Sequence, residues 1–467
     1  MVSPSSSHKL GTCPFAHTGE PPQSPNRATP GPQGLSELTR DADVLHFLSD
    51  LFKTYGDVAH YRTRTGNCYL FVHPDHVRTI LHDENFRRAS LVRLMLGDGL
   101  LASDGPRWRS QRRIMQRSFH PPAVAPFAKI IGRETARLAA QWRQAAAGRT
   151  PVDVTADMTR LTLRIIVASL FSTDLSDADS EQVCEAVTQT VNDLGEISRI
   201  VFGVPVNLTP QRNASFAASK KAIDAVCYDL IRRRRAVAEA DRPDDLLTLL
   251  IEAETDAGPM TDLQLRDELL TMLVGGHETT ALALAWTWKL LAEHPEHAAA
   301  LHGELAATPL ATEPDADAVA ALEYTHAVFQ ETMRLYPPVW NMARVATEAA
   351  VVDGHAIERG ACVLIAPYLT HRHPAFWPEP ERFDPARFLQ PADRHRYAFM
   401  AFGGGRHMCL GINLAQLEGT QILAHLAGEF RLKPLNAEQV RPDGGITLRQ
   451  SPSMLAHVEL QPKAAKP

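Results

Sequence analysis

Closely spaced cysteines are missing from this chain of 467 residues. Its six cysteines are scattered along the sequence, and no two of them form a CxxC pair. A disulfide framework or a structural zinc site needs clustered cysteine or histidine residues, so the sequence predicts neither. Cysteine usage of this kind is typical of a reducing compartment.

A long hydrophobic segment is also missing. No run of about 18 apolar residues occurs, so we expect no membrane anchor. The stretch MVSPSSSHKLGTCPFAH at residues 1–17 contains no apolar core like that of a secretory signal peptide. Together with the cysteine usage, these features predict a cytoplasmic protein.

The chain has no excess of basic residues, with 48 Lys and Arg against 54 Asp and Glu. A dedicated nucleic-acid binder normally shows the opposite balance, so we expect no nucleic-acid partner. No GxGxxG fingerprint of a dinucleotide-binding domain occurs either. The hydrophobic share of 44% is ample for a large core.

Composition divides the chain into two parts. Residues 1–34 are rich in Pro, Ser and Gly and are predicted to form a flexible leader. Residues 35–467 show no repeat and no second compositional regime, so we expect a single domain, mainly α-helical with small β-sheets. A hairpin is expected over residues 60–72, with its turn near residues 65–67. The main helices are expected at Trp108–Ser118, Ala123–Ala147, Val154–Leu170, Ser180–Leu194, Ala214–Ala240 and Met260–Glu293.

One cysteine follows a glycine-rich loop and precedes a helix. The segment reads Phe402-Gly-Gly-Gly-Arg-His-Met-Cys409-Leu-Gly411, followed by a helical pattern. Unpaired backbone N–H groups at a helix start favour a thiolate over a thiol. A thiolate in this position suits the axial coordination of haem iron. A structural cysteine beside a glycine-rich turn is the plainer alternative.

This segment resembles the cysteine signature of the cytochrome P450 haem-thiolate monooxygenases, Phe-x-x-Gly-x-x-x-Cys-x-Gly. Phe402, Gly405, Cys409 and Gly411 match it, and further family motifs extend the resemblance over roughly residues 36–460. The resemblance implies the P450 fold, with haem b between the long central helix and the helix after Cys409. It also implies Cys409 as the iron ligand, O2 as co-substrate, and a monomer.

The middle of the longest predicted helix carries a second motif, Gly275-Gly-His-Glu278-Thr279-Thr. Two adjacent glycines cost about 2 kcal/mol there relative to alanine, so a helix distortion that admits a small ligand is plausible. Glu278 and Thr279 resemble the acid–alcohol pair with which the family delivers protons to dioxygen. A close helix contact at the glycines is the alternative. A metalloprotease HExxH motif is excluded because residue 281 is alanine.

A third motif, Glu331-Thr-Met-Arg334, places an acid and a base on one helical face. In isolation such a pair is usually a surface salt bridge of little consequence. In the family it is a buried scaffold that engages a downstream arginine, for which Arg382 is the expected residue. These three residues are interpreted as structural.

Four residues resemble the family's contacts with the haem propionates. Trp108 and Arg112 are four residues apart and share one helical face. Arginine suits a carboxylate because its donors form a planar fork. His407 stands where the family has a basic residue two positions before the cysteine, and Arg344 matches a further propionate-binding arginine.

The resemblance implies a monooxygenase that takes its electrons from outside. No flavin or iron–sulfur domain is recognisable in the chain, so the expected donor is a separate ferredoxin or flavodoxin with its NAD(P)H reductase. Such partners are typically acidic, and a basic surface would favour docking. The candidate docking residues are Arg109, Arg113, Arg117 and Arg406.

The expected substrate is a hydrophobic small molecule, such as a fatty acid, a terpenoid or a similar natural product. By resemblance, several mostly apolar segments form the pocket walls. Asn341 and Arg93 are candidate anchors for a polar group. The segments are residues 91–101, 187–208, 269–273, 339–342 and 445–448.

Three functions are compatible with these motifs. The first is an O2-dependent monooxygenase that hydroxylates or epoxidises its substrate, favoured by the coexistence of Glu278–Thr279 with the Cys409 signature. The second is a peroxide-driven or non-oxygenating enzyme of the same fold, which often lacks such a pair. The third is a haem-binding sensor or carrier without turnover.

Overall fold

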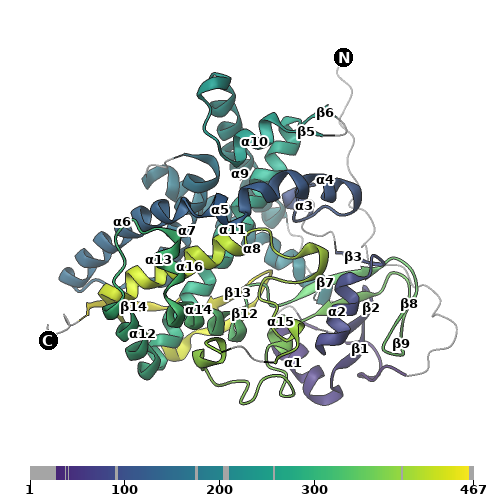
Figure 1. Ribbon diagram of the computed structural model, residues 1–467. Helices are drawn as coiled ribbons and strands as arrows, with labels where there is room; N and C mark the ends of the chain where they lie inside the picture. The colour runs from purple at the N-terminus through teal and green to yellow at the C-terminus, as the bar shows by residue number, and fades with distance from the viewer. Residues whose placement is uncertain are drawn as a thin grey trace.

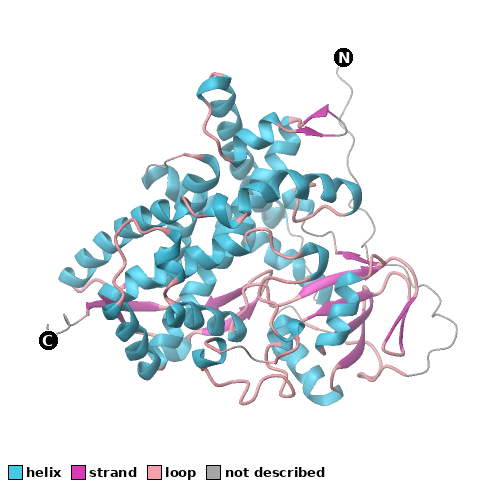
Figure 2. Ribbon diagram, in the orientation of Figure 1, coloured by secondary structure: helices cyan, strands magenta, loops and turns pink. Residues whose placement is uncertain are grey.

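Helices form most of the molecule, and the strands gather mainly at one side (Figure 1, Figure 2). This arrangement confirms the predicted class, mainly α-helical with small β-sheets. The computed structural model describes residues 28–36, 38–39, 42–89, 93–173, 177–202, 204, 210–255, 258–390 and 393–461.

Most helices lie close to the predicted ranges, with ends shifted by up to four residues, but the helix predicted over residues 123–147 is divided into α5 and α6. Their bounds are α1 Val44–Tyr55, α2 Pro74–His82, α3 Arg93–Leu96, α4 Gly105–Met115, α5 Pro121–Val124, α6 Phe127–Gly148, α7 Val154–Phe171, α8 Asp177–Ser198, α9 Pro210–Ala236, α10 Leu246–Glu252, α11 Asp262–Glu293, α12 Pro295–Ala307, α13 Ala316–Ala320, α14 Glu323–Leu335, α15 Pro367–Thr370 and α16 Ile412–Glu429.

The largest described sheet has the strand order β1-β2-β10-β7-β3 and mixes parallel with antiparallel pairs. The remaining strands form one sheet of three strands and several two-stranded ribbons. The strands are β1 Val58–Thr63, β2 Gly66–Phe71, β3 Phe86–Arg88, β4 Val152–Asp153, β5 Glu254–Thr255, β6 Gly258–Pro259, β7 Met342–Ala346, β8 Ala350–Val352, β9 His355–Ile357, β10 Cys362–Ile365, β11 Phe430–Pro434, β12 Arg441–Gly444, β13 Leu448–Ser451 and β14 Leu455–Leu460.

The predicted leader lies mainly outside the described residues, which begin at residue 28. Its last part runs along β1, where His60 N donates to Pro30 O at 2.8 Å. Just beyond it, Ser36 N donates to Arg62 O at 2.7 Å. β1 and β2 form the expected hairpin, and because Thr63 pairs with Gly66 the turn is at residues 64–65.

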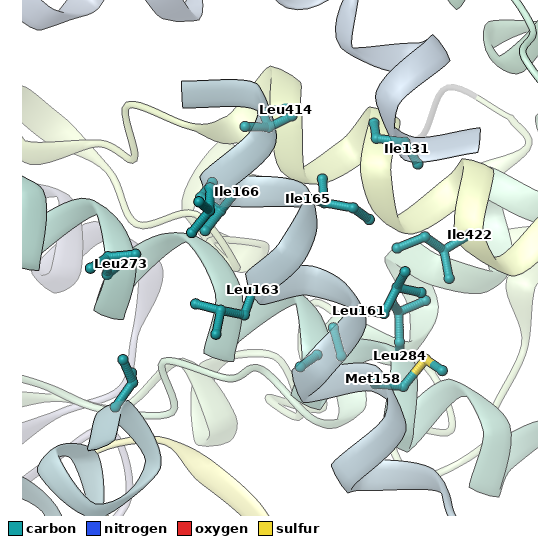
Figure 3. Close-up of a cluster of buried hydrophobic side chains, with 14 of the residues drawn as sticks. Ile131, Met158, Leu161, Leu163, Ile165, Ile166, Leu273, Leu284, Leu414 and Ile422 are labelled. Carbon is teal, nitrogen blue, oxygen red and sulfur yellow. The ribbon is translucent and has the colours of Figure 1, made fainter. Parts of the chain in front are cut away.

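The core of the helical part is built around α11. This helix packs against α7, α9, α14 and α16, which places the helix after Cys409 directly against the longest helix of the fold. Figure 3 shows aliphatic side chains of α6, α7, α11 and α16 meeting in one cluster. Burial of such side chains stabilises the fold by about 25 cal/mol per Å² of apolar surface.

Both ends of α11 carry capping signals that can be read from the sequence. Thr261 and Gln264 form a capping box, and His294 is the C-terminal cap before Pro295. The expected distortion at Gly275 and Gly276 is not seen, because the helix is continuous from Asp262 to Glu293. The glycines instead differ in their surroundings. A Cβ at Gly276 would lie 2.6 Å from Ile166 Cδ1, whereas one at Gly275 would meet no atom within 4 Å.

No helix among the described residues combines the length and the apolar character needed to span a membrane.

Candidate active site

The loop before Cys409 is shaped by glycines. Gly403 and Gly405 have φ angles of 70° and 64°, a region that strongly favours glycine. A Cβ at Gly405 would also lie 2.5 Å from Leu81 O on α2, so the loop can press against this helix only without a side chain there. The loop closes on itself where Cys409 N donates to Phe402 O at 2.9 Å.

Opposing effects act on the pKa of the Cys409 thiol. The side chain has accessible surface, yet it lies deep enough among protein atoms for burial to raise the pKa of the thiol. The Gly411 N–H and the Arg112 guanidinium oppose this effect and lower the pKa. Gly411 is the N-cap of α16, so the cysteine is at the positive end of a helix dipole, as the sequence predicted. An electron-rich sulfur at this point could coordinate a metal centre.

Three of the predicted propionate-binding residues meet beside this loop. Arg112 on α4 donates to Met408 O at 2.8 Å, which joins residues 296 apart in sequence. The Trp108 ring meets the His407 ring edge to face, with centroids 4.5 Å apart. The Arg112 guanidinium lies 6.0 Å from the centroid of the Trp108 ring. The structure therefore brings Trp108, Arg112 and His407 together next to Cys409.

Arg344 reaches the same region from the β-sheet. A second arginine lies beside it that was not predicted from the sequence. Arg88 on β3 is the direct cross-strand partner of Arg344 on β7. Burial lowers the pKa of Arg344 to about 10. Burial, followed by the nearby charge of Arg344, lowers the pKa of Arg88 to about 9. Like charges directly opposite each other destabilise a sheet, so this arrangement favours an anionic ligand.

The polar atoms around these arginines fit the carboxylates of a haem. Trp108 Nε1 and His407 Nε2 are buried and have no hydrogen-bond partner among the described residues. His407 Nε2 does lie 3.3 Å from Asp104 Oδ1, but without hydrogen-bond geometry. Buried polar atoms normally find partners, so a free indole N–H and an unpartnered imidazole nitrogen beside several cations suit a dianionic group. A thiol on the same side completes the donor set that a haem requires.

The predicted acid–alcohol pair lies on α11. Thr279 Oγ1 donates to Gly275 O at 3.1 Å, beside the glycine whose Cα faces open space. Glu278 is buried, with 5% of its surface exposed. Its Oε1 accepts from Thr447 Oγ1 at 3.0 Å and from Arg449 Nε at 2.8 Å. Arg449 is 171 residues away from Glu278 and was not predicted from the sequence.

The predicted scaffold pair is present, but its third member is different. Arg334 donates to both carboxylate oxygens of Glu331 at 2.7 Å, and both side chains are fully buried. The Arg382 side chain instead donates to Glu379 at 3.0 Å, and only its backbone carbonyl contacts Arg334. Arg387 is the arginine whose side chain approaches Glu331, at 3.5 Å. The prediction of Arg382 was therefore wrong by five residues.

Arg406 was expected to help dock the redox partner and Arg93 to anchor the substrate, but the structure pairs both with acidic side chains. Arg406 is half-buried and donates to Glu84 at 2.7 Å, so its charge is already compensated. Arg93, a candidate substrate anchor, forms an exposed ion pair with Asp98. Parts of two predicted pocket segments, residues 91–92, 203 and 205–208, lie outside the described residues.

Comparisons with known proteins agree with this geometry. The family model for cytochrome P450 matches residues 25–456. Cyclooctatin synthase of Streptomyces melanosporofaciens is 32% identical over 91% of this chain and 94% of its own length. Cyclooctat-9-en-7-ol 5-monooxygenase of the same organism is 30% identical over 90% and 93%, respectively. Pentalenene oxygenase of Streptomyces avermitilis is 28% identical over 85% and 89%.

A solved structure has the same fold. The heme domain of a cytochrome P450DA mutant superposes with a TM-score of 0.79 at 24% identity, covering 90% of this chain and 94% of that chain. Haem with cysteine thiolate ligation and O2-dependent oxygenation are properties of the matched family. The family model and the relatives at 30% identity or more, each covering most of this chain, show that the chain is a cytochrome P450 monooxygenase.

Proposed function

We propose that this enzyme inserts oxygen from O2 into a terpenoid-type small molecule, with haem b held by Cys409. The observation that carries the proposal is the accessible Cys409 thiol at the start of α16, beside the cluster of Trp108, Arg112, His407 and Arg344. When bound, the haem supplies the oxidising chemistry of its thiolate-ligated iron. Hydroxylation or epoxidation is the expected outcome for the substrate.

The residues around Cys409 have separate roles in this proposal. Phe402 and Gly405 shape the loop, and the Gly411 N–H stabilises negative charge on the sulfur. Trp108, Arg112, His407 and Arg344 bind the propionates, and we add Arg88 to this set because it lies opposite Arg344.

Thr279 and Glu278 on α11 would move protons toward the oxygen substrate. Thr279 Oγ1 donates to Gly275 O, so its own lone pairs are available to accept a further hydrogen bond. Glu278 is one residue earlier on the same helix and is the acid of the pair. A positioned acid of this kind contributes about 10²- to 10⁴-fold to a rate.

A terpenoid-type substrate is supported by the relatives and by the apolar groups near the site. Two of the similar enzymes are named for oxygenation of cyclooctat-9-en-7-ol and pentalenene. In this chain Leu101 and Val339 remain accessible, at 41% and 38%. Leu101 is tied to the propionate region because its carbonyl accepts from Arg88 at 2.8 Å. Val339 precedes β7, the strand of Arg344.

Electrons come, in this proposal, from a separate ferredoxin or flavodoxin with its NAD(P)H reductase. Arg109, Arg113 and Arg117 are exposed at positions i, i+4 and i+8 along α4 and the turn after it. No acidic side chain among the described residues is paired with them. Arg112 of the same helix contacts Met408, so this stripe is adjacent to the cysteine loop and suits an acidic partner.

The remaining parts of the proposal concern the chain as a whole. We place the catalytic domain at residues 35–467, acting as a monomer in the cytoplasm.

The experiment is a reconstitution with ferredoxin, its reductase, NADPH and 18O2, using a panel of cyclic terpenes and terpene alcohols. The proposal predicts a product that carries one 18O atom and requires the full electron-transfer chain. Product formed equally well from hydrogen peroxide alone would favour the peroxide-driven alternative. Binding of haem without any product in either system would favour a sensor or carrier.

A further inference from the structure

Arg449 on β13 connects three elements that are far apart in sequence. Its Nε donates to Glu278 Oε1 on α11 at 2.8 Å, and its Nη2 contacts the same oxygen. Its Nη1 donates to Asn192 Oδ1 on α8. One guanidinium therefore bridges the acid of the proposed proton-delivery pair and a helix that contributes to the predicted pocket wall.

The hairpin that carries Arg449 is fastened to α11. Trp286 Nε1 donates to Leu448 O at 3.1 Å, and Gln450 Nε2 donates to Ala285 O at 3.0 Å. These bonds flank Arg449 on both sides in the sequence. The backbone of Arg449 is therefore fixed relative to Glu278, and only the outer end of its side chain depends on α8.

α8 approaches the same hairpin at its turn. A Cβ at Gly195 would lie 3.6 Å from Ile446 N and 3.9 Å from Gly445 Cα. Asn192 and Gly195 are three residues apart and so share one face of α8. The contact of Asn192 with Arg449 and the contact of Gly195 with the turn therefore belong to one interface.

The described residues hydrogen-bond the Glu278 carboxylate through one of its two oxygens. Every donor that the described residues offer to its carboxylate, from Thr447 and Arg449, reaches Oε1. A buried carboxylate is costly unless it is paired and hydrogen-bonded, so removal of the guanidinium would leave it poorly solvated. Pairing at one oxygen also fixes the direction of the other, which is the oxygen free to exchange a proton.

We propose that Arg449 is a positioning residue that orients Glu278 for proton transfer and, through Asn192, makes this orientation depend on the seating of α8. The inference rests on the proposed role of Glu278. A substrate that holds α8 against the hairpin keeps the guanidinium anchored at both ends. When the Asn192 contact is lost, the Arg449 guanidinium is held only at its Glu278 end among the described residues. The Glu278 carboxylate can then rotate.

The experiment compares Glu278→Gln, Arg449→Gln, Arg449→Lys and Asn192→Ala in the haem-loaded enzyme with its redox partners. It measures the share of NADPH electrons recovered as product rather than as hydrogen peroxide. Arg441→Gln is the matched control, because Arg441 is exposed on the paired strand β12 and its guanidinium bonds, among the described residues, only its own neighbour, Val440 O. Spectral titration with substrate shows in parallel whether binding itself has changed.

We expect Arg449→Gln to raise the ratio of peroxide to product about five-fold or more, with substrate affinity nearly unchanged. Asn192→Ala has a smaller effect in the same direction, and adding it to Arg449→Gln changes nothing further, because both act through one contact. Arg449→Lys keeps the charge but cannot reach both partners with a planar fork, so it falls between wild type and Arg449→Gln.

A readout independent of turnover is thermal unfolding. Arg449→Gln should lower the midpoint because it leaves a buried carboxylate without its cation, and Glu278→Gln in the same chain should restore part of the loss. The inference would be overturned if Glu278→Gln lowers the share of NADPH electrons recovered as product, while Arg449→Gln gives the same share as the Arg441→Gln control. If Glu278→Gln itself leaves the coupling unchanged, the proposed role of Glu278 fails, and the inference fails with it.

Discussion

At the scale of single residues, the site combines groups that would be unfavourable without a ligand. Arg88 and Arg344 face each other across two strands, and burial lowers the pKa of both guanidinium groups. A protein keeps such a pair when an anion compensates for it. The haem propionates are that anion in the proposed function.

Replacement of Arg344 by Gln tests this interpretation. We expect haem affinity to fall about 10- to 100-fold, because one charge-assisted hydrogen bond is worth roughly 1.5–3 kcal/mol. The haem-free protein should be no less stable than wild type, since the substitution relieves repulsion with Arg88. Haem transfer to apomyoglobin measures the first quantity and denaturant unfolding the second. A haem-free variant that is clearly destabilised would show that Arg344 is instead required by the fold.

The Thr279→Ala variant tests whether the hydroxyl of Thr279 takes part in proton delivery. The variant should bind haem and substrate normally, since the Thr279 hydroxyl bonds only Gly275 O among the described residues. Product formation should fall roughly 10- to 100-fold while NADPH consumption continues and hydrogen peroxide accumulates. The ratio of product to peroxide is the measurement, and Thr279→Ser is the control that keeps the hydroxyl. Equal ratios in wild type and Thr279→Ala would remove Thr279 from proton delivery.

At the scale of elements, the two glycines of α11 have opposite surroundings. Gly275→Ala should raise the free energy of unfolding by up to about 1 kcal/mol, because alanine is the better helix former and its methyl group meets no atom. The same methyl group would enter the space beside Thr279 and should reduce oxygenation. Gly276→Ala should be destabilising, because its Cβ would collide with Ile166. Unfolding and turnover of both variants check this contrast, and equal behaviour of the two would contradict it.

The scaffold around α14 and α15 predicts a dependence of stability on pH. His371 is buried, and burial followed by the charge of Arg334 lowers its pKa to about 3. Met400 N donates to His371 Nε2 at 2.8 Å, and Nδ1 faces Arg334 O at 3.2 Å, so the neutral ring is satisfied on both sides. Below pH 6.5 the unfolded chain takes up a proton that the folded chain refuses until about pH 3. Stability is therefore lost as the pH falls through this window.

Replacement of His371 by Gln should flatten this dependence. Between about pH 6.5 and pH 4 the wild type should lose about 3 kcal/mol more than the variant, because each pH unit in this window changes the free energy of unfolding by roughly 1.4 kcal/mol. Denaturant unfolding at several pH values gives both slopes. His425, whose ring nitrogens lie 2.9 Å from the carbonyl oxygens of Gln421 and Ala311 near the surface, provides a control substitution. Parallel slopes for wild type and His371→Gln would assign the acid sensitivity to other groups.

The sequence predicted what depends on local pattern or on a family motif. The glycine loop and the common face of Trp108 and Arg112 both involve residues a few positions apart. Arg88 and Arg449 could not be predicted from the sequence, because their roles depend on strand register and on the position of a hairpin, which bring distant segments together. Arg382 was expected from the family resemblance, and a motif does not show which downstream arginine turns its side chain toward Glu331; in the structure it is Arg387.

At the scale of the whole molecule, the basic stripe Arg109, Arg113 and Arg117 predicts how the enzyme meets its electron donor. Arg109→Glu with Arg113→Glu should raise the KM for ferredoxin about ten-fold or more and leave haem content unchanged. High salt should weaken the wild-type interaction in the same way, because exposed charges are screened. Arg359→Glu, at an exposed arginine in the turn before β10, is the control. Unchanged KM values for the double variant would place the docking surface elsewhere.

The central claim is that Cys409 is the thiolate ligand of a haem. The most direct test is the carbon monoxide difference spectrum of the reduced protein, recorded beside a Cys409→Ala variant. Thiolate ligation by Cys409 should give a strongly red-shifted Soret band in the wild type that disappears in the variant. A protein without haem, or one with a band typical of imidazole ligation in both forms, would contradict the account.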